Sequence, residues 1–385
     1  MSAVLSGTGP GLTLSIADLP LWQGVRKEPG VQRRFPFRLG FTGPGPIRQT
    51  TEAEVVAEVL KSYAGDDYAF LTKPPGASAW ADSLGDSKVA AVMENWTGRA
   101  PRTILEVGAG STYVGEKLLA RFGEGPTYTI VDPAVREDGG RIEVVRDYFP
   151  APALQGRRFD LIIGFNCLEH VPDPVAVLAA ARRHLAPGGL VLMTYPDTEQ
   201  NLNEGDINAL MHEHLSYFTE RSSRWAAQAA GLAVQGLERR AGAFVAVLEH
   251  PPEPLAHPGD LWEEDLLRHA AGMLDSLLLR TGGEISARLQ AGETVAFHGA
   301  TNGLNSFLAL TGLGDHPAIR VFDGDDSKVG QFLPACPTPI LGSGDPSYPA
   351  HDAIYVSAVT FLPAIRRFAQ QVHGLPAERL LPLVG

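Results

Sequence analysis

Cysteine is scarce in this chain of 385 residues, because only Cys167 and Cys336 occur and neither has a cysteine partner at metal-binding spacing. A disulfide framework and a cysteine-rich zinc site are thereby excluded. Such scarcity fits a reducing compartment, so we expect a cytoplasmic location. Long apolar runs are lacking too, since no stretch approaches the about 18 residues that cross a bilayer, and residues 1–30 show no secretory-signal pattern. We therefore expect a soluble protein without a membrane partner.

Positively charged residues are also few in comparison with acidic ones. Lys and Arg number 32 against 44 Asp and Glu, which gives a formal charge of −12. This charge would repel a nucleic acid unless a local basic patch intervened, and the sequence shows no such patch. We therefore expect no nucleic-acid partner. A composition of 44% hydrophobic and 20% charged residues is that of an ordinary globular protein, and the length predicts two or three domains.

The pattern along the chain predicts three domains and an α/β fold class. Residues 1–85 are rich in Gly, Pro and Arg and predict a short N-terminal module of strands and turns with a leading helix over 52–63. Residues 86–250 begin with a helix over 86–96 and continue with apolar runs separated by helical segments, which is typical of a parallel sheet with crossover helices. The runs are TILEVG, YTIVD, FDLIIGF and LVLMTYP. Residues 251–385 follow a His-Pro-Pro-Glu-Pro break and predict a helix over 259–289 and a smaller α/β domain.

A glycine-rich turn follows the first of these runs. Its residues are Glu106, Val107, Gly108, Ala109 and Gly110. Ligands of an open α/β sheet bind at the carboxyl ends of its strands, where glycine lets the backbone approach them closely. Asp132 ends the second run, where a carboxylate can accept hydrogen bonds from both hydroxyls of a ribose. Asp147 and Asn166 follow the next runs, and together these positions predict a nucleoside-binding edge.

The glycine-rich turn allows two other interpretations. The glycines and acidic residues can serve only as turn residues and helix caps. A nicotinamide cofactor is disfavoured, because the third glycine of the dinucleotide fingerprint is not at its expected place. S-adenosyl-L-methionine has no pyrophosphate and needs no such glycine.

The successive segments ILEVGAGS, VDP, FDLIIGFNCLEHVPDP and LAPGGLVLMTYP resemble the motifs of class I S-adenosyl-L-methionine-dependent methyltransferases. The resemblance implies a central Rossmann-like class I methyltransferase domain and this compound as the cofactor. It further implies that Glu106 orients the methionine portion, that the turn from Gly108 to Gly110 faces it, and that Asp132 holds the ribose. Asp147 and Tyr148 are then expected near the adenine.

A second motif, Met-His-Glu-His-Leu-Ser-Tyr-Phe, begins at Met211. Its two histidines beside a carboxylate allow three interpretations. A metal site is one, although the His-Glu-x-x-His helical pattern is missing and His-x-His brings both side chains to one face only in an extended strand. A general base is another, since histidine titrates near neutrality. In the third, the histidines only pack and cap the loop. We expect no metal.

This motif is similar to the Tyr-His-Glu-His-Leu-Ser-Tyr-Phe segment of sugar C-methyltransferases that act on nucleotide-linked 4-keto-deoxysugars. The resemblance implies that His214 is the base that forms the enolate, with Glu213 as a second catalytic residue. It extends to FHGATNGLNSFLA and DDSKVGQFLPACPTPI in the C-terminal domain, which we expect to bind the substrate or its nucleotide. The turn over 299–303 can present backbone N–H groups to a phosphate. The candidate substrate-binding residues are His170, His212, Tyr217, His298 and Asn302.

The sequence departs from that family at several positions. Its four N-terminal zinc-binding cysteines are absent, so no zinc is expected in the N-terminal module. Met211 replaces the tyrosine before His-Glu-His, and Asn302 replaces the lysine of the glycine-rich turn. Glu169 precedes His170 where the sugar enzymes usually have alanine. Each change is compatible with methyl transfer but alters the environment of the acceptor.

Three functions remain open from the sequence. The first is methyl transfer to carbon of a nucleotide-activated keto-deoxysugar or a related small metabolite, with His214 as the base. The second is an O- or N-methyltransferase of another small secondary metabolite. The third is a non-catalytic scaffold that binds the cofactor. The partner is a small-molecule substrate in the first two, and the sequence leaves the acceptor, the methylated atom and the oligomeric state open.

Overall fold

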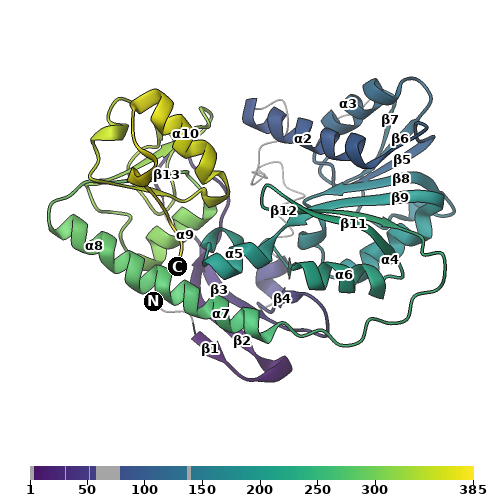
Figure 1. Ribbon diagram of the computed structural model, residues 1–385, viewed down its shortest axis with the longest axis horizontal. Coiled ribbons are helices and arrows are strands. Elements are labelled where there is room, and N and C mark those ends of the chain that lie inside the picture. Colours follow the sequence, from purple (N-terminus) through teal and green to yellow (C-terminus); the bar gives the residue numbers. More distant parts are fainter. Residues whose placement is uncertain (1–3, 31, 52, 58–78, 137–139) are drawn as a thin grey trace.

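The computed structural model describes the chain except residues 1–3, 31, 52, 58–78 and 137–139. Three sheets organise the described residues, and helices connect and cover them (Figure 1). The α/β fold class expected from the sequence is confirmed. The predicted helix over 52–63 lies mostly outside the described residues.

The central sheet has seven strands in the order β11-β12-β9-β8-β5-β6-β7. Five neighbouring strands, β9 to β7 in this order, pair in parallel, and β12 is antiparallel to both of its neighbours. The strands are β5 (Thr103–Val107), β6 (Thr127–Val131), β7 (Ile142–Val145), β8 (Phe159–Phe165), β9 (Leu185–Pro196), β11 (Ala233–Arg240) and β12 (Ala243–Glu249). The apolar runs of the sequence became the buried strands of this sheet.

Helices cover both faces of the central sheet, because its strands are apolar on both sides. One core contains side chains of α4 (Pro174–His184) and α6 (Glu220–Ala229), and the other contains side chains of α2 (Ala79–Asn95) and α3 (Tyr113–Phe122). The predicted helix over 86–96 is the second half of the longer α2. Parallel strands place their carboxyl ends at one edge, so the loops after β5, β6 and β8 meet there.

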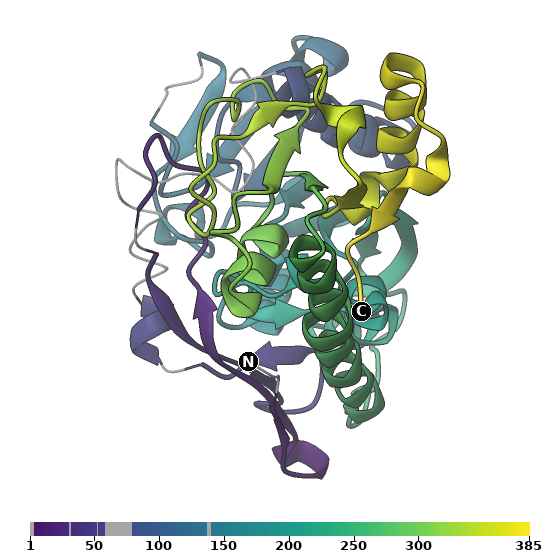
Figure 2. The same ribbon diagram turned by 90° about the vertical axis from the view of Figure 1, so that its left-hand side faces the viewer.

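A second parallel sheet lies in the C-terminal part, in the order β15-β14-β13-β16-β17. Its strands are β13 (Val295–His298), β14 (Ile319–Asp323), β15 (Leu341–Gly342), β16 (Ala353–Val356) and β17 (Leu380–Pro382). Helix α9 (Asn302–Thr311) follows β13, and α10 (Leu362–His373) precedes β17. In place of the predicted helix over 259–289, the structure has α7 (Glu264–Asp275), a π-helical stretch (Ser276–Thr281) and α8 (Gly282–Gln290). These three elements follow one another as one continuous helix in Figure 2.

The N-terminal sheet is antiparallel and takes its last strand from far along the chain. Its order is β1-β2-β3-β4-β10, with β1 (Val4–Ser6), β2 (Thr13–Pro20), β3 (Arg34–Gly40), β4 (Ile47–Gln49) and β10 (Ser216–Tyr217). One apolar core joins this sheet to α5 (Thr198–Glu204), α7, α8 and the C-terminal sheet. The segment that carries the His-Glu-His motif is therefore fixed by the N-terminal sheet.

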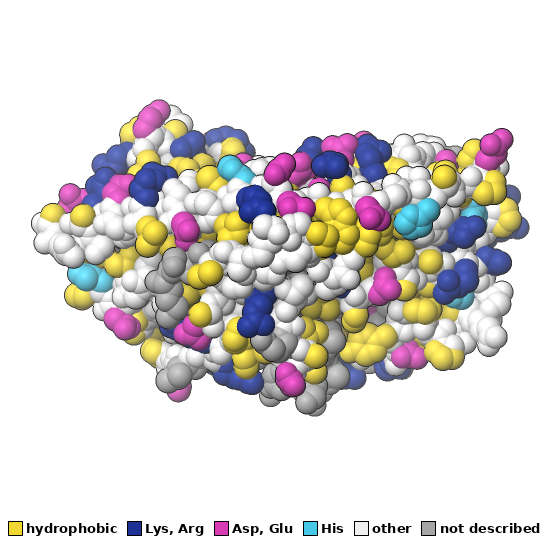
Figure 3. Space-filling model, turned by 90° about the horizontal axis from the view of Figure 1, so that it is seen from below, with side chains coloured by type: hydrophobic (Ala, Val, Ile, Leu, Met, Phe, Trp, Pro, Cys, Tyr) yellow, Lys and Arg dark blue, Asp and Glu magenta, His cyan; other side chains and the backbone are white. Residues whose placement is uncertain are grey.

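Charged side chains of both signs are interspersed on the face seen in Figure 3, rather than gathered into one basic field. Among the described residues, none of the helices combines the length and the apolar character that a bilayer crossing requires.

The N-terminal core predicts a large cost for removing Phe37. This side chain is fully buried, and its ring packs edge-on against His212 at 5.4 Å and Tyr217 at 6.5 Å between centroids. We expect Phe37→Ala to lower the free energy of unfolding by about 3–5 kcal/mol in urea titrations, because it leaves a cavity. Val4→Ala, at an exposed position, is the control and should change it by less than about 0.5 kcal/mol. Similar losses in both variants would mean that Phe37 is not part of this core.

Candidate active site

The turn after β5 has the backbone conformation that the glycines allow. Gly108 and Gly110 have φ values of 69° and 71°, where other residues are strained. The backbone N–H of Gly110 donates to Asp132 Oδ2 at 2.8 Å, and that of Ala134 donates to Oδ1 at 2.6 Å. Each carboxylate oxygen has a second lone pair, so Asp132 keeps acceptor capacity at the strand end. The turn and Asp132 are thus brought together at one edge, and Ala109 lies between the two glycines.

Glu106 is held inside the protein. Its side chain is 1% exposed, and Oε2 accepts a hydrogen bond from the Tyr128 hydroxyl at 2.7 Å. Burial raises the pKa of Glu106 to about 7, an effect that the Tyr128 hydrogen bond and the positive charge of Lys88 partly offset. This carboxyl can therefore change its charge state when a cation binds beside it.

Three further predicted residues lie along the same edge. Asp147 and Tyr148 follow β7, where Asp147 Oδ1 accepts the Tyr148 backbone N–H at 2.7 Å and Tyr148 is 56% exposed. Asn166 follows β8 with a φ of 52°, and its side chain hydrogen-bonds to the Glu169 carboxyl. Asn166 thus holds another site residue, while Tyr148 is open to a ligand.

Lys88 is a residue of this edge that the sequence analysis missed. It lies on α2, with Nζ 5.6 Å from the centroid of the Phe165 ring at the end of β8. Burial lowers the pKa of Lys88, whereas the negative charges of Glu106, Cys167 and Glu169 raise it. The edge thus combines an ammonium with acidic groups. A lone lysine on an irregular helical pattern carries no local sequence signal.

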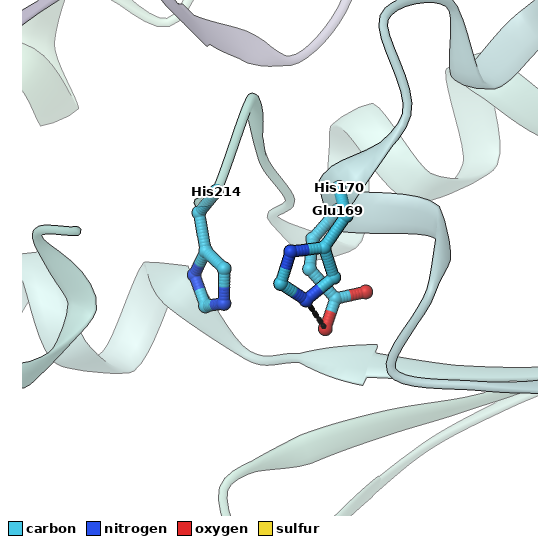
Figure 4. A group of neighbouring side chains, drawn as sticks. All are labelled: Glu169, His170 and His214. Atoms are coloured by element: carbon cyan, nitrogen blue, oxygen red, sulfur yellow. Dashed lines mark ion pairs between the residues drawn. The ribbon is translucent and has the colours of Figure 1, made fainter. Parts of the chain in front are cut away.

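Glu169, His170 and His214 form a compact cluster at the end of β8 (Figure 4). Glu169 and His170 belong to a 3-10 turn (Leu168–His170), and His214 comes from the loop before β10. His170 Nε2 lies 3.7 Å from Glu169 Oε1, and the rings of His170 and His214 meet edge-on at 4.9 Å between centroids. The Leu215 backbone N–H donates to the Glu169 backbone carbonyl at 2.7 Å and joins the two loops. Residues far apart in sequence therefore share one site.

Burial makes this cluster electrically neutral near pH 7. It raises the pKa of Glu169 to about 8, lowers that of His170 to about 4, and lowers that of His214 well below its ordinary value. Glu169 is then protonated, and both imidazoles are uncharged and able to accept a proton. Glu169 Oε2 and His214 Nδ1 are buried, with no hydrogen-bond partner among the described residues. The cluster is suited to proton transfer.

The same three side chains are those that could hold a metal ion. Their ligand atoms lie within 4.8 Å of one another. His170 Nδ1 faces the Glu213 backbone carbonyl at 2.9 Å, a contact that fixes the orientation of the ring in metal sites and in proton-transfer sites alike. A metal here would occupy the nitrogen and carboxyl that proton transfer needs, so the two uses exclude each other.

Two of the predicted substrate residues face the N-terminal sheet instead. His212 is buried between the rings of Phe35 and Phe37, and its Nε2 lies 3.3 Å from the Pro36 carbonyl. Tyr217 is fully buried, and its hydroxyl donates to the Met211 carbonyl at 3.3 Å. Residues 211–214 form a turn, in which the His214 backbone N–H donates to the Met211 carbonyl at 3.2 Å, so His212 and His214 do not share a face as they would in an extended strand. Both His212 and Tyr217 are engaged by protein groups in this structure, and their binding of substrate stays a prediction. Glu213 is buried next to His214 and contributes its carbonyl to His170.

The remaining two predicted substrate residues lie in the C-terminal sheet region. His298 ends β13, and its Nδ1 contacts the Tyr348 hydroxyl at 2.8 Å within the core. Asn302 begins α9, and its Nδ2 donates to the Leu210 carbonyl at 3.1 Å. In this structure both are buried and engaged by protein groups, and their binding of substrate stays a prediction. The turn over 299–303 offers no open phosphate cradle, because a Cβ at Gly303 would lie 2.5 Å from the Asn208 side chain.

The central part of the chain is similar to proteins of a known family. Residues 84–237 match the family described as methyltransferase domain. Residues 84–237 form a class I S-adenosyl-L-methionine-dependent methyltransferase domain. The cofactor of such a domain is S-adenosyl-L-methionine, and the acceptor capacity of Asp132 and the opposite charges of Lys88 and Glu106 fit its ribose and its zwitterionic amino-acid group.

Among curated relatives, C-methyltransferase NovU of Streptomyces niveus is 28% identical over 248 residues, which are 56% of this chain and 57% of NovU. A ubiquinone biosynthesis O-methyltransferase of Aliivibrio fischeri is 26% identical over 136 residues, 31% of this chain and 58% of the relative. The chain thus spans less than two thirds of the length of these relatives. The solved structure of human N-acetylserotonin methyltransferase with S-adenosyl-L-methionine has a TM-score of 0.35 and 14% identity, covering 51% of this chain and 66% of that one.

The raised pKa of Glu169 predicts a pH-dependent stability. Its carboxyl is neutral in the folded protein up to about pH 8 but ionises near 4.5 when unfolded, so its favourable contribution is complete at low pH and is lost as pH rises between these values. Glu169→Gln stays neutral at every pH. We expect its melting temperature to match the wild type at about pH 4 and to exceed it by a few degrees at about pH 9. The exposed Glu253→Gln is the control, and melting curves for Glu169→Gln that stay parallel to the wild type would contradict the assignment.

Proposed function

We propose that this protein transfers a methyl group from S-adenosyl-L-methionine to a carbon beside the carbonyl of a small keto compound, most specifically a nucleotide-activated keto-deoxysugar. The observation that carries the proposal is the neutral His214 imidazole beside a neutral Glu169 carboxyl at the edge of the methyltransferase sheet. The similarity to NovU, named as a C-methyltransferase, supports the choice of carbon.

His214 acts as the general base in this proposal. Its uncharged ring accepts the proton from the carbon beside the carbonyl, and the electron pair left behind forms an enolate. Protonated Glu169, whose ligand oxygen lies within 4.8 Å of the ligand nitrogen of His214, stabilises the charge that develops on the enolate oxygen. The enolate carbon would then take the methyl group as the methyl–sulfur bond breaks, and the thioether S-adenosylhomocysteine would leave. His170 separates the two groups and keeps its ring fixed through the Glu213 carbonyl.

The bound cofactor supplies the activated methyl group on its sulfonium. In this proposal Asp132 holds the ribose, Tyr148 and Asp147 lie near the adenine, and Lys88 pairs with the carboxylate of the amino-acid portion. Glu106 faces the amino group of that portion, and Lys88 and Glu106 together match a zwitterion. The turn from Gly108 to Gly110 lets the backbone approach this ligand.

A second candidate is O-methylation of a small metabolite. The ubiquinone O-methyltransferases that match this chain support it, although they match only 31% of the chain or less. His214 would then take a proton from a hydroxyl. Product analysis separates the candidates, because the protons of a methyl group on carbon have a lower NMR chemical shift than those of a methyl ether.

The cofactor assignment predicts two distinct binding defects. S-adenosylhomocysteine carries both a ribose and an amino-acid carboxylate, whereas 5′-methylthioadenosine carries only the ribose. By calorimetry, Asp132→Ala should weaken both ligands by about 1.5–3 kcal/mol, the scale of charge-assisted hydrogen bonds. Lys88→Met should weaken S-adenosylhomocysteine alone. Equal losses for both ligands in Lys88→Met would remove the carboxylate contact, and no binding to the wild type at millimolar ligand would overturn the assignment of these residues to the cofactor.

The base assignment predicts a selective loss of turnover. We expect His214→Ala to keep its affinity for S-adenosylhomocysteine within about twofold and to lower turnover at least about a hundredfold, the usual scale for removing a general base. The measurement is methyl transfer to a panel of nucleotide-linked keto-sugars, with proton exchange at the carbon beside the carbonyl followed by NMR. His212→Ala is the matched control, two residues away and buried against another sheet. Undiminished exchange in His214→Ala would remove it from the mechanism.

A further inference from the structure

The C-terminal sheet has the topology of a ligand-binding unit. Strand β13 lies between β14 and β16, and the chain leaves β13 first toward one side and later toward the other. Such a reversal of strand order opens a crevice at the carboxyl ends of the two strands, where open α/β sheets bind their ligands. Here the crevice lies between the turn after β13 and the loop after β16.

The chain's own segment 206–210 fills this crevice. Asn208 is its central residue, in a 3-10 turn (Ile207–Ala209). Its Oδ1 accepts the backbone N–H of Gly303 at 2.8 Å, and its Nδ2 donates to the Ser357 carbonyl at 2.7 Å. The Asn208 side chain thus bridges the loops after β13 and β16. Gly303 lacks the Cβ that would lie 2.5 Å from Asn208, so glycine permits this contact.

Asn302 completes the arrangement from the opposite side. Its Nδ2 donates to the backbone carbonyl of Leu210 at 3.1 Å and lies 3.4 Å from that of Asn208. At the other end of segment 206–210, the Asp206 side chain accepts hydrogen bonds from the backbone N–H and the side-chain amide of Asn208. Leu210 lies four residues before His214. The crevice therefore binds the residues that directly precede the loop carrying His214, which belongs to the cluster with Glu169 and His170.

Other polar groups of the same edge are also engaged within the protein. Asp323, at the end of β14, accepts the Ala300 backbone N–H at 2.7 Å and pairs with Lys328 at 2.9 Å. The Leu304 backbone N–H is capped by Thr301. A nucleotide could enter only by displacing segment 206–210, and that would move the loop that carries His214.

We propose that the C-terminal unit binds segment 206–210 as an internal ligand, and that Asn208 and Asn302 are positioning residues that place His214 against Glu169. The effect on catalysis rests on the role proposed for His214. The binding of segment 206–210 by the C-terminal unit does not depend on that role. The nucleotide of an acceptor would then bind outside this crevice.

Hydrogen exchange followed by mass spectrometry tests the grip without an acceptor. In Asn302→Leu and in Asn208→Ala, we expect amides of 206–217 to exchange at least about tenfold faster. The first variant loses two hydrogen bonds to carbonyls of the segment, and the second loses three, two of which join the segment to the C-terminal unit. Peptides of β5 and β8 should keep their wild-type rates, and affinity for S-adenosylhomocysteine should stay within about twofold. Asn302→Ala removes the same donor without added bulk and is measured in parallel in case Asn302→Leu fails to fold.

Asn305→Leu is the matched control. Asn305 is a buried residue one turn further along α9, and it bonds to Ala335 and Gln32 rather than to segment 206–210. It should lower the melting temperature without accelerating exchange over 206–217. Unchanged exchange over 206–217 in Asn302→Leu, Asn302→Ala and Asn208→Ala, or equal acceleration in Asn305→Leu, would overturn the proposal.

A nucleotide probe gives the second arm. Thymidine diphosphate added to the wild type should leave exchange over 206–210 and 299–305 unchanged. Slower exchange over 299–305 together with faster exchange over 206–210 would show that the crevice is a nucleotide site and would overturn the internal-ligand proposal. Failure of every acceptor to be methylated would count against the proposed function alone, because neither exchange experiment uses an acceptor. Once an acceptor is known, Asn302→Ala should lower kcat with little change in KM, and Asn305→Leu should change neither.

Discussion

The position of His214 depends on hydrogen bonds to the backbone of segment 206–217. These bonds come from several parts of the fold. Gln49 in the N-terminal sheet donates from one amide nitrogen to the carbonyls of His212 and His214, at 2.9 and 2.8 Å. Asn302, at the start of α9 in the C-terminal unit, donates to the Leu210 carbonyl, and the Glu169 carbonyl, in the 3-10 turn after β8, accepts the Leu215 N–H. Because these contacts come from three different parts of the fold, the site forms only when all three are assembled.

Desolvation sets the chemistry that this assembly permits. The chain carries a formal charge of −12, yet burial makes the cluster around His214 neutral near pH 7. A neutral imidazole beside a neutral carboxyl combines a proton acceptor and a proton donor, whereas protonation of the imidazole would prevent it from accepting the proton of the substrate carbon. The lowered pKa also makes His214 a weak base. Proton removal from the substrate carbon therefore has to be favoured by stabilisation of the enolate rather than by the strength of the base. In the proposed mechanism this requirement makes Glu169 significant, because its protonated carboxyl can donate to the enolate oxygen.

Local sequence pattern was enough to predict the central sheet and the turn with Asp132, because apolar runs, glycine and strand-end acids are neighbours along the chain. It did not show that His212 and Tyr217 pack in the N-terminal core, since a turn over 211–214 directs His212 toward Phe35 and Phe37. The pairing of β10 with β4 decides which side faces the N-terminal core, and those strands are far apart in sequence. Lys88 and Asn208 carry no motif, so only the folded arrangement shows that they lie beside functional groups.

The C-terminal unit shows that a ligand-binding topology need not bind a separate ligand. Its strand order creates a crevice, and a crevice lined by backbone N–H groups and carbonyls is costly unless those groups are bonded. Asn208 and Asn302 satisfy several of them with neutral amides, which both donate and accept, whereas a lysine at position 302 could only donate. Replacing that cation by an amide trades an anion-binding group for one that holds carbonyls of the catalytic segment. In the proposed mechanism the acceptor is then recognised at the edge of the methyltransferase sheet, where Glu169, His170 and His214 supply polar groups.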